Sequence, residues 1–327
     1  MPVSEFALIR DYFSRCGAER DDVLLGVGDD AALLRAPAGR DLVVAVDTLV
    51  SGVHFLPDVD PAALGHKALA VNLSDLAAMG ADPAWATLAL TLPAADPEWL
   101  AAFTRGLCGL ARRFGVSLVG GDTTRGPLTV SVQLQGFVPA GEAIRRSGAR
   151  PGDSVFVTGT LGDAGLALRE LLSGGAPGPE VRARLERPEP RVAVGIALRG
   201  LAGAAIDISD GLVADLGHLL EASGVGAEVE LGALPLSAAV RDSVNRSGDW
   251  DLVLGSGDDY ELCFTVPPER LGALGSLPGH PGCGIHRIGR VLPGEGLHCV
   301  GVDGVLWQPA VRGYDHFSGS VSPDAGP

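Results

Sequence analysis

The stretch LGVGDDAAL, residues 25–33, places two glycines and two adjacent acids just before the chain turns apolar. Glycines beside acids at a turn let the backbone approach a ligand or a cation closely. The neighbouring carboxylates of Asp29 and Asp30 repel each other unless a cation or several donors lie between them. Taken alone, the stretch is more typical of a surface turn that caps a strand. Similar acidic turns recur further along the chain, and this recurrence favours a binding function.

Size and charge narrow the class of protein. The chain has 327 residues, of which 46% are hydrophobic, and this is enough for a large core and predicts two domains. The formal net charge is -15, so the basic surface of a nucleic-acid-binding protein is absent. An anionic substrate would be repelled by such a protein unless cations intervened.

The cysteines and the apolar segments predict a cytoplasmic protein. Five cysteines are present without any CxxC pair, and we expect free, mostly buried thiols in a reducing compartment. Residues 1–10 carry acid and no long apolar run, unlike a signal peptide. No uncharged apolar stretch of about 18 residues occurs, so we expect no membrane span. The five cysteines are Cys16, Cys108, Cys263, Cys283 and Cys299.

Strand and helix patterns alternate along the chain and predict an α/β fold. The segment 41–47, DLVVAVD, is typical of a buried strand, and Pro61 suits the first turn of a long helix that ends near Gly80. The polar, turn-rich segment 145–153 is the expected domain boundary. We therefore predict an N-terminal domain over residues 1–148 and a C-terminal α/β domain over residues 149–327.

Acidic residues recur where predicted strands end. Asp47 ends the strand at 41–47, and Asp122 follows the double glycine at 120–121, whose backbone amides could cradle phosphate oxygens. Asp75 lies inside an apolar helical segment, so it is either at an exposed edge or bound to something, because burying an unpaired charge is costly. The complete set of candidate ligands is Asp30, Asp47, Asp75, Asp122, Asp207 and Asp210.

This donor set predicts a hard cation and a phosphate-bearing substrate. All-oxygen ligands favour Mg²⁺ or Mn²⁺, whereas zinc would require closely spaced cysteine or histidine. Bound cations would also explain how an acidic protein accepts polyanions. The Walker A motif, the protein-kinase signatures and the GxSxG elbow are absent. Residues 26–28 supply the first two glycines of the dinucleotide-binding motif GxGxxG, but the third glycine is missing. Phosphoryl transfer would therefore use a different scaffold.

Eight motifs in order give the chain a family resemblance. They are GVGDDAALL (26–34), DTLVSGVHF (47–55), HKALAVNLSDLAAMGADP (66–83), GGDTTRGPL (120–128), RSGARPGD (146–153), VTGTLGDA (157–164), AIDISDGLVADLGH (205–218) and DDYELCFT (258–265). Together they resemble the thiamine-monophosphate kinases, within the aminoimidazole-ribonucleotide-synthetase-like superfamily. The resemblance implies a two-domain α/β homodimer whose N-terminal sheet packs across the dimer. It also implies ATP-dependent phosphorylation of thiamine monophosphate to thiamine diphosphate.

The resemblance assigns roles to individual residues. The six aspartates match magnesium ligands, with Asp30 rather than Asp29 as the ligand in the first stretch. The residues that match ATP contacts are Gly121, Asp122, Arg146 and Ser209, and those that match substrate contacts are His54, Asp258 and Phe317. Two positions depart from the family pattern: Asp258 stands where a glutamate is usual, and Val46 where a hydroxyl residue is frequent. These departures put in doubt a direct substrate contact at 258 and a side-chain metal contact at 46.

The implied reaction is chemically reasonable for these residues. The acceptor phosphate, with a second pKa of about 6, is largely ionised near neutral pH, so no general base is needed. Mg²⁺ and Arg146 would neutralise two anions and align them for direct in-line transfer. The competing hypotheses are another ATP-dependent synthetase of the superfamily and a non-catalytic nucleotide-binding regulatory dimer.

Overall fold

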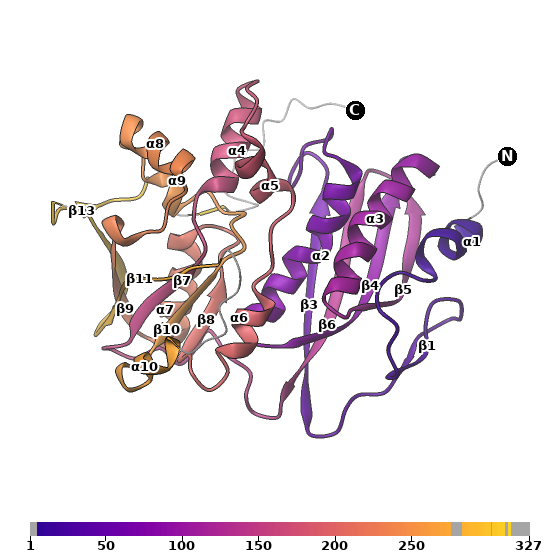
Figure 1. Cartoon of the computed structure of the whole chain (residues 1–327), viewed down its shortest axis with the longest axis horizontal. Coiled ribbons are helices and arrows are strands. Elements are labelled where there is room, and N and C mark those ends of the chain that lie inside the picture. The colour runs from indigo at the N-terminus through magenta and orange to yellow at the C-terminus, as the bar shows by residue number, and fades with distance from the viewer. Residues whose placement is uncertain (1–4, 276–282, 302, 311–312, 315–327) are drawn as a thin grey trace.

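The computed structural model describes residues 5–275, 283–301, 303–310 and 313–314. Figure 1 shows an N-terminal half with helices on one side of a sheet, beside a C-terminal half that also combines a sheet with helices. The sheets have four and seven strands, and a two-stranded ribbon lies near the N-terminus. The α/β prediction is confirmed. Within the described residues, no helix is long and apolar enough to cross a membrane.

The four-stranded sheet has the order β3-β6-β4-β5, with only β4 and β5 parallel. Helices α2 and α3 cover one of its faces (Figure 1). The elements of this half are α1 (Glu5–Leu8), the π-helical turn η1 (Ile9–Phe13), β1 (Val23–Leu25), β2 (Leu33–Leu34), β3 (Arg40–Val50), α2 (Pro61–Ala78), β4 (Asp82–Leu92), α3 (Pro97–Arg113), β5 (Ser117–Arg125) and β6 (Thr129–Pro139). The segment 120–125, where the sequence predicted the end of a strand, is instead part of β5.

Local chemistry explains where α2 and α3 begin and how closely they pack. Each starts with an aspartate cap followed by proline, and the Asp60 carboxylate accepts the Ala62 N–H at 3.1 Å. Gly65 and Gly106 lie where the two helices touch. A Cβ atom at Gly106 would lie 1.9 Å from the Ala62 carbonyl oxygen. Glycine is therefore required for this close approach, which makes α2 a firmly held element.

The other face of the four-stranded sheet is covered only in part, because the β1–β2 ribbon buries Trp85 and Phe137 there but leaves β3 exposed. Leu42, Val44 and Val46 alternate along β3, and their exposed fractions are 52%, 51% and 63%. The residues between them in sequence point toward α2, because successive side chains of a strand lie on opposite faces. A row of apolar side chains is therefore left on the surface of a single chain.

The C-terminal half is built on the sheet β13-β12-β9-β11-β7-β10-β8. Its elements are β7 (Ser154–Thr158), α4 (Asp163–Leu172), α5 (Pro179–Glu186), α6 (Val192–Ala197), β8 (Ala204–Asp207), α7 (Leu212–Ser223), β9 (Gly226–Glu230), the 3-10 turn η2 (Leu231–Ala233), α8 (Ala238–Ser247), α9 (Asp251–Leu254), β10 (Leu262–Val266), the 3-10 turn η3 (Pro268–Arg270), α10 (Leu271–Leu274), β11 (Ile285–Leu292), β12 (Gly296–Val300) and β13 (Leu306–Trp307).

Buried contacts join the two halves. One apolar core contains α2 residues such as Leu73 together with Phe156 on β7 and Phe264 on β10. Gly195 on α6 packs so closely on α2 that a Cβ atom there would lie 2.0 Å from the Ala77 carbonyl oxygen. The predicted boundary between residues 148 and 149 stays a prediction, since an apolar core continues across it.

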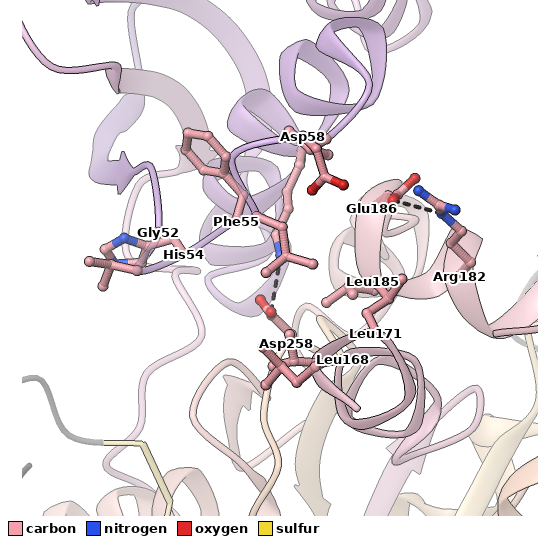
Figure 2. A pocket seen from close by; sticks show the side chains of 15 residues that line it. Gly52, His54, Phe55, Asp58, Leu168, Leu171, Arg182, Leu185, Glu186 and Asp258 are labelled. Atoms are coloured by element: carbon pink, nitrogen blue, oxygen red, sulfur yellow. Dashed lines mark hydrogen bonds and ion pairs between the residues drawn. The ribbon is translucent and has the colours of Figure 1, made fainter. Parts of the chain in front are cut away.

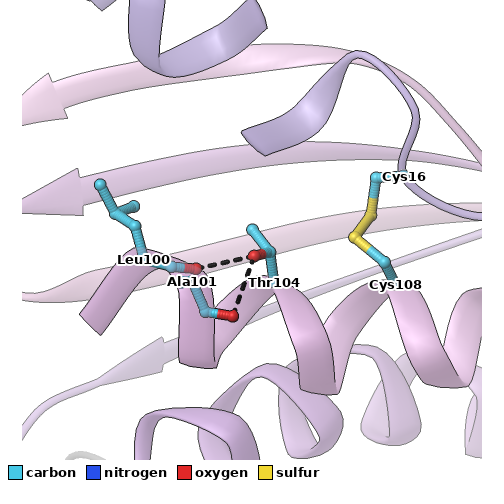
Figure 3. The surroundings of a disulfide bond; sticks show 5 residues. All are labelled: Cys16, Leu100, Ala101, Thr104 and Cys108. Atoms are coloured by element: carbon cyan, nitrogen blue, oxygen red, sulfur yellow. Dashed lines mark hydrogen bonds between the residues drawn. A yellow bond between two sulfur atoms is a disulfide. The ribbon is translucent and has the colours of Figure 1, made fainter. Parts of the chain in front are cut away.

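The prediction that all five cysteines are free was wrong. Cys16 and Cys108 form a disulfide that links the segment after η1 to α3 (Figure 3). Their Cα atoms lie 4.9 Å apart although 92 residues separate them in sequence. Packing of the N-terminal segment on α3 creates this proximity, which cysteine spacing could not reveal. Cys263 and Cys299 are free and buried, and Cys283 is free and half-buried.

Candidate active site

Three carboxylates meet where α2 lies against β3 and the end of β8. Burial raises the pKa of Asp75 to about 8, and the charges of Asp207 and Asp47 add to this rise. Burial likewise raises the pKa of Asp207 to about 6, although the Ser74 hydroxyl donates to its carboxylate at 2.7 Å. The pKa of Asp47 is raised by burial, although a hydrogen bond with Asp75 opposes the rise. The three groups repel one another, and a cation placed among them would relieve the repulsion.

Arg146 is the basic residue of this group of acids. Its charge lowers the pKa values of Asp75 and Asp207 and so offsets part of the rise. Arg146, Asp75 and Asp207 line a cavity of about 230 Å³ between β3, α2 and β8. A phosphate that enters this cavity would meet the Arg146 guanidinium, which can bind it, and the neighbouring carboxylates, which can bind a cation that accompanies the phosphate.

Asp210 and Ser209 lie in the loop between β8 and α7. The Asp215 carboxylate accepts the backbone N–H groups of Ser209, Asp210 and Gly211 at 3.0, 3.0 and 3.1 Å. Burial raises the pKa of Asp215 to about 7, with the Asp207 and Asp210 charges adding to it. The sequence did not single out Asp215. Its one signal was an acidic residue in the first turn of a mostly apolar helix.

A larger cavity of about 600 Å³ joins several predicted residues. It is lined by Asp47, Ser209, Asp210, His54 and Asp258, together with Val71 of α2. The His54 ring accepts the Val50 N–H at Nδ1, 3.0 Å away, which fixes the ring beside the end of β3. The predicted acceptor contacts His54 and Asp258 therefore share a cavity with two predicted metal ligands. Phe317 lies outside the described residues.

Asp258 is paired with a residue to which the sequence assigned no role. The Lys67 ammonium on α2 donates to its carboxylate at 3.0 Å (Figure 2). The two residues are separated by 191 positions in sequence. The one available signal was that Lys67 is the only lysine in the chain.

The remaining two predicted ligands lie elsewhere. Asp30, Asp122 and Gly121 line a separate cavity of about 490 Å³ beside β5. In the first stretch, Asp29 accepts the Asp30 N–H at 2.8 Å and so supports the loop. Because β3 and β5 are the opposite edges of the sheet, about 14 Å of sheet separates them.

The register also puts Asp122 and Asp47 on opposite faces of the sheet. Thr48, Ser131, Ala89 and Asp122 form one cross-strand row, and Asp47 precedes Thr48. Within the described residues, no three acidic, histidine or cysteine side chains already converge closely enough to hold a metal ion. A single chain therefore brings together Asp47, Asp75, Asp207 and Asp210, but leaves Asp30 and Asp122 apart from them.

Known proteins share both the sequence and this architecture. Residues 28–138 match the family described as AIR synthase related protein, N-terminal domain, and residues 150–301 match the corresponding C-terminal domain. Thiamine-monophosphate kinase of Salmonella typhimurium strain LT2 is 50% identical over 97% of this chain and 99% of its own length. The enzyme of Escherichia coli strain K12 is equally similar. The chain belongs to the thiamine-monophosphate kinase family.

Solved structures extend the comparison. Thiamine-monophosphate kinase from Stenotrophomonas maltophilia K279a is 50% identical, with a TM-score of 0.82 over 88% of this chain and 92% of that one. A structure of AaThiL complexed with AMPPCP and TMP is 36% identical, with a TM-score of 0.75 over 89% of this chain and 92% of that one. The hydrogenase maturation protein HypE in complex with ATP shares the fold at 23% identity.

Proposed function

We propose that this member of the family transfers the terminal phosphoryl group of ATP to the phosphate of thiamine monophosphate, forming thiamine diphosphate and ADP. The observation that carries the proposal is the group of mutually repelling carboxylates Asp47, Asp75 and Asp207, in a chain half identical to curated thiamine-monophosphate kinases. The relative complexed with AMPPCP, an ATP analogue, and TMP supports this pair of substrates.

The carboxylate group fits Mg²⁺. Its donors are oxygens, and burial together with repulsion between the acids raises the pKa values of Asp75 and Asp207, which a bound cation would counteract. Asp47, Asp75, Asp207 and Asp210 would hold the ions, which supply charge neutralisation between two phosphates when bound. Arg146 would add a cation fixed to the protein. The chain's own contribution is then to hold these oxygens still and to bind both substrates in line.

We propose that the active protein is a homodimer whose sites use both protomers. The exposed row Leu42, Val44 and Val46 lies on the same face of the sheet as Asp122. A partner packed on this face would cover the apolar row. Its Asp30 and Asp122 could then reach the carboxylate group, which lies on the other face, around the edge strand β3. This arrangement would join the predicted ATP contacts Gly121 and Asp122 to Arg146 and Ser209, which one chain holds apart.

Mixing two inactive variants tests the shared site. Asp75→Asn and Asp122→Asn would each remove activity alone. A heterodimer of the two would contain one doubly altered site and one intact site, so co-refolded protein should regain about half of the activity per heterodimer. A mixture that stays inactive although heterodimers form would contradict the shared site. Monomeric, active protein in sedimentation would contradict the dimer.

The acceptor is expected to enter the cavity lined by His54 and Asp258. The thiazolium ring is a flat cation, and the Asp258 carboxylate is the acidic group on this side of the cavity. Phe317 remains a candidate stacking partner for such a ring. We also propose a cytoplasmic location, since the donor ATP is available there. Thiol counting in protein isolated without oxidant would show whether the Cys16–Cys108 disulfide persists in that compartment.

A direct assay tests the reaction. Purified protein is incubated with ATP, Mg²⁺ and thiamine monophosphate, and the products are separated by chromatography. Thiamine diphosphate and ADP are expected in equal amounts, and neither should form without the acceptor. Turnover with a different acceptor, but none with thiamine monophosphate, would overturn the proposal. A phosphorylated protein intermediate on the kinetic path would overturn direct transfer.

A further inference from the structure

Lys67 is a buried cation with a specific partner. It lies on α2, is 3% exposed and is the only lysine in the chain. A lysine is rarely buried unless its charge is paired. Here its ammonium donates to the Asp258 carboxylate at 3.0 Å, and the dashed line that ends at Asp258 in Figure 2 marks this contact. The Asp258 side chain remains 27% exposed, so the pair is closed toward α2 and open toward the cavity.

The backbone around Asp258 is held in an unusual conformation. Its φ angle is +60°, and that of Tyr260 is +49°, both in the left-handed region that few non-glycine residues adopt. The Asp258 N–H donates to the Ser209 carbonyl at 2.8 Å, and the Tyr260 N–H donates to the Ile208 carbonyl at the same distance. The loop is therefore held against the segment that carries Ser209 and Asp210. The Tyr260 hydroxyl also bonds to the Asp258 carboxylate.

Asp258 stands where two cavities meet. One is the 600 Å³ cavity that contains Asp47 and Asp210. The other has a volume of about 200 Å³ and is lined by apolar residues of α4 and α5, including Leu171 and Leu185 (Figure 2). Asp258, His54, Val53 and Leu168 line both. A ligand that extends from the reacting phosphates into the apolar cavity must pass this carboxylate.

Helix α2 connects this carboxylate to the metal-binding end of the site. Lys67, Val71 and Asp75 recur every four residues and so lie along one face of the helix. Eight residues of helix correspond to about 12 Å between Lys67 and Asp75 along the axis. Val71 lines the larger cavity between them. Because α2 is buried and locked to α3 through Gly65 and Gly106, this spacing is fixed.

We propose that Lys67 is a positioning residue for the acceptor: it holds the Asp258 carboxylate at the junction of the two cavities and so sets the affinity for thiamine monophosphate without affecting ATP. The inference rests on the proposed function and deepens it. The carboxylate offers an acceptor oxygen or a counter-charge to the cationic ring, and the ammonium keeps it from rotating away. Lys67 is buried and its ammonium is engaged by Asp258, although the residue also lines the smaller cavity. Its proposed effect runs through Asp258, and a double-mutant cycle separates this from a direct contact with the ligand.

A double-mutant cycle tests whether Lys67 acts through Asp258. Lys67→Met keeps the length of the side chain and removes its charge, while Asp258→Asn keeps the shape of the partner. In the otherwise natural chain, Lys67→Met should raise the KM for thiamine monophosphate by about fivefold or more and leave the KM for ATP within about twofold. In the Asp258→Asn background, the same substitution should change the KM for thiamine monophosphate by less than about twofold.

The single lysine permits a second measurement on the natural sequence. Tag-free protein labelled with [13Cε]lysine should give one lysine signal in the NMR spectrum, because Lys67 is the only lysine. Thiamine monophosphate should shift this signal, whereas Mg²⁺ and AMPPCP alone should not. This measurement does not depend on the variants folding.

Three results would overturn the inference: additive effects in the cycle, an equal rise in the KM for ATP, or a Lys67 signal that does not respond to thiamine monophosphate. The failures of the two proposals are distinguishable. An unaltered protein that makes no thiamine diphosphate would count against the proposed function. An active protein with an unresponsive Lys67 signal would count against the role of Lys67 alone.

Discussion

Replacing Asp75 by asparagine should have opposite effects on activity and on the stability of the metal-free protein. Asp75 lies between Asp47 and Asp207, and its pKa is raised to about 8 from an ordinary value of 3.8. Asparagine cannot carry the negative charge, but its amide can still donate a hydrogen bond to Asp47. The variant would therefore lose a ligand for Mg²⁺ and at the same time lose a source of repulsion.

The magnitude follows from the pKa difference. At pH 7.5 the carboxyl is ionised in the unfolded chain and mostly protonated in the folded chain, which costs up to about 5 kcal/mol of folding stability. Asp47 and Asp207 can take up the proton instead, so we expect about 2 kcal/mol to be regained in Asp75→Asn. Turnover with Mg²⁺ should fall by about a hundredfold or more, because the group that binds the ions is incomplete.

Urea denaturation at pH 7.5 in the presence of EDTA measures the stability effect, and the thiamine diphosphate assay measures turnover. Adding Mg²⁺ should stabilise the natural chain more than the variant, because only the natural chain has the full ligand set. Asp29→Asn serves as a matched control, since it removes an acid that supports a loop. A variant that is less stable than the natural chain in EDTA, or that keeps near-normal turnover, would refute the reasoning.

Three further predictions concern pH and packing. In EDTA, the free energy of unfolding should fall as pH rises from about 5.5 to 8. The reason is that Asp207, Asp215 and Asp75 have raised pKa values of about 6, 7 and 8 and bind protons more tightly when the chain is folded. Urea denaturation at several pH values, with and without Mg²⁺, checks this, and a pH slope unaffected by Mg²⁺ would contradict it. Glu261→Gln should lower the free energy of unfolding by about 3 kcal/mol or more, because this fully buried carboxylate accepts hydrogen bonds from Arg184, Arg191 and Thr158. The control Glu228→Gln, in a surface pair with Arg290, should lower it by less than about 1 kcal/mol. Equal losses in urea denaturation would argue against the buried network. Gly106→Ala should lower the free energy of unfolding by about 3 kcal/mol, because its Cβ atom would clash with the Ala62 carbonyl oxygen. The control Gly109→Ala, on the same helix, places its Cβ atom where nothing lies within 4 Å and should be neutral or stabilising by up to about 1 kcal/mol. Similar melting temperatures for the two variants would show that the α2–α3 contact can relax.

Short-range patterns were sufficient to predict the elements that carry the site. The sequence Asp60-Pro61 marks the start of α2 because a capping carboxylate and a fixed φ angle act within a few residues. Asp207 could be placed at a strand end because the apolar run of β8 stops there, whereas the strand predicted to end at Asp47 continues to Val50. For Asp75 the sequence left open an exposed edge or a bound partner, and the structure places this acid beside Asp47 and Asp207, whose charges repel it.

Only the tertiary structure decided which of these groups meet. The order β3-β6-β4-β5 puts Asp122 at the sheet edge opposite Asp47 and on the other face, and no local pattern contains strand order. The pairs Cys16–Cys108 and Lys67–Asp258 are separated by 92 and 191 residues and come together only when whole elements pack. The sequence by itself therefore determined the elements, the acids and the family, since these depend on neighbouring residues. The division of the acids into two groups and the pairing of Lys67 depend on long-range packing, which the sequence order does not display.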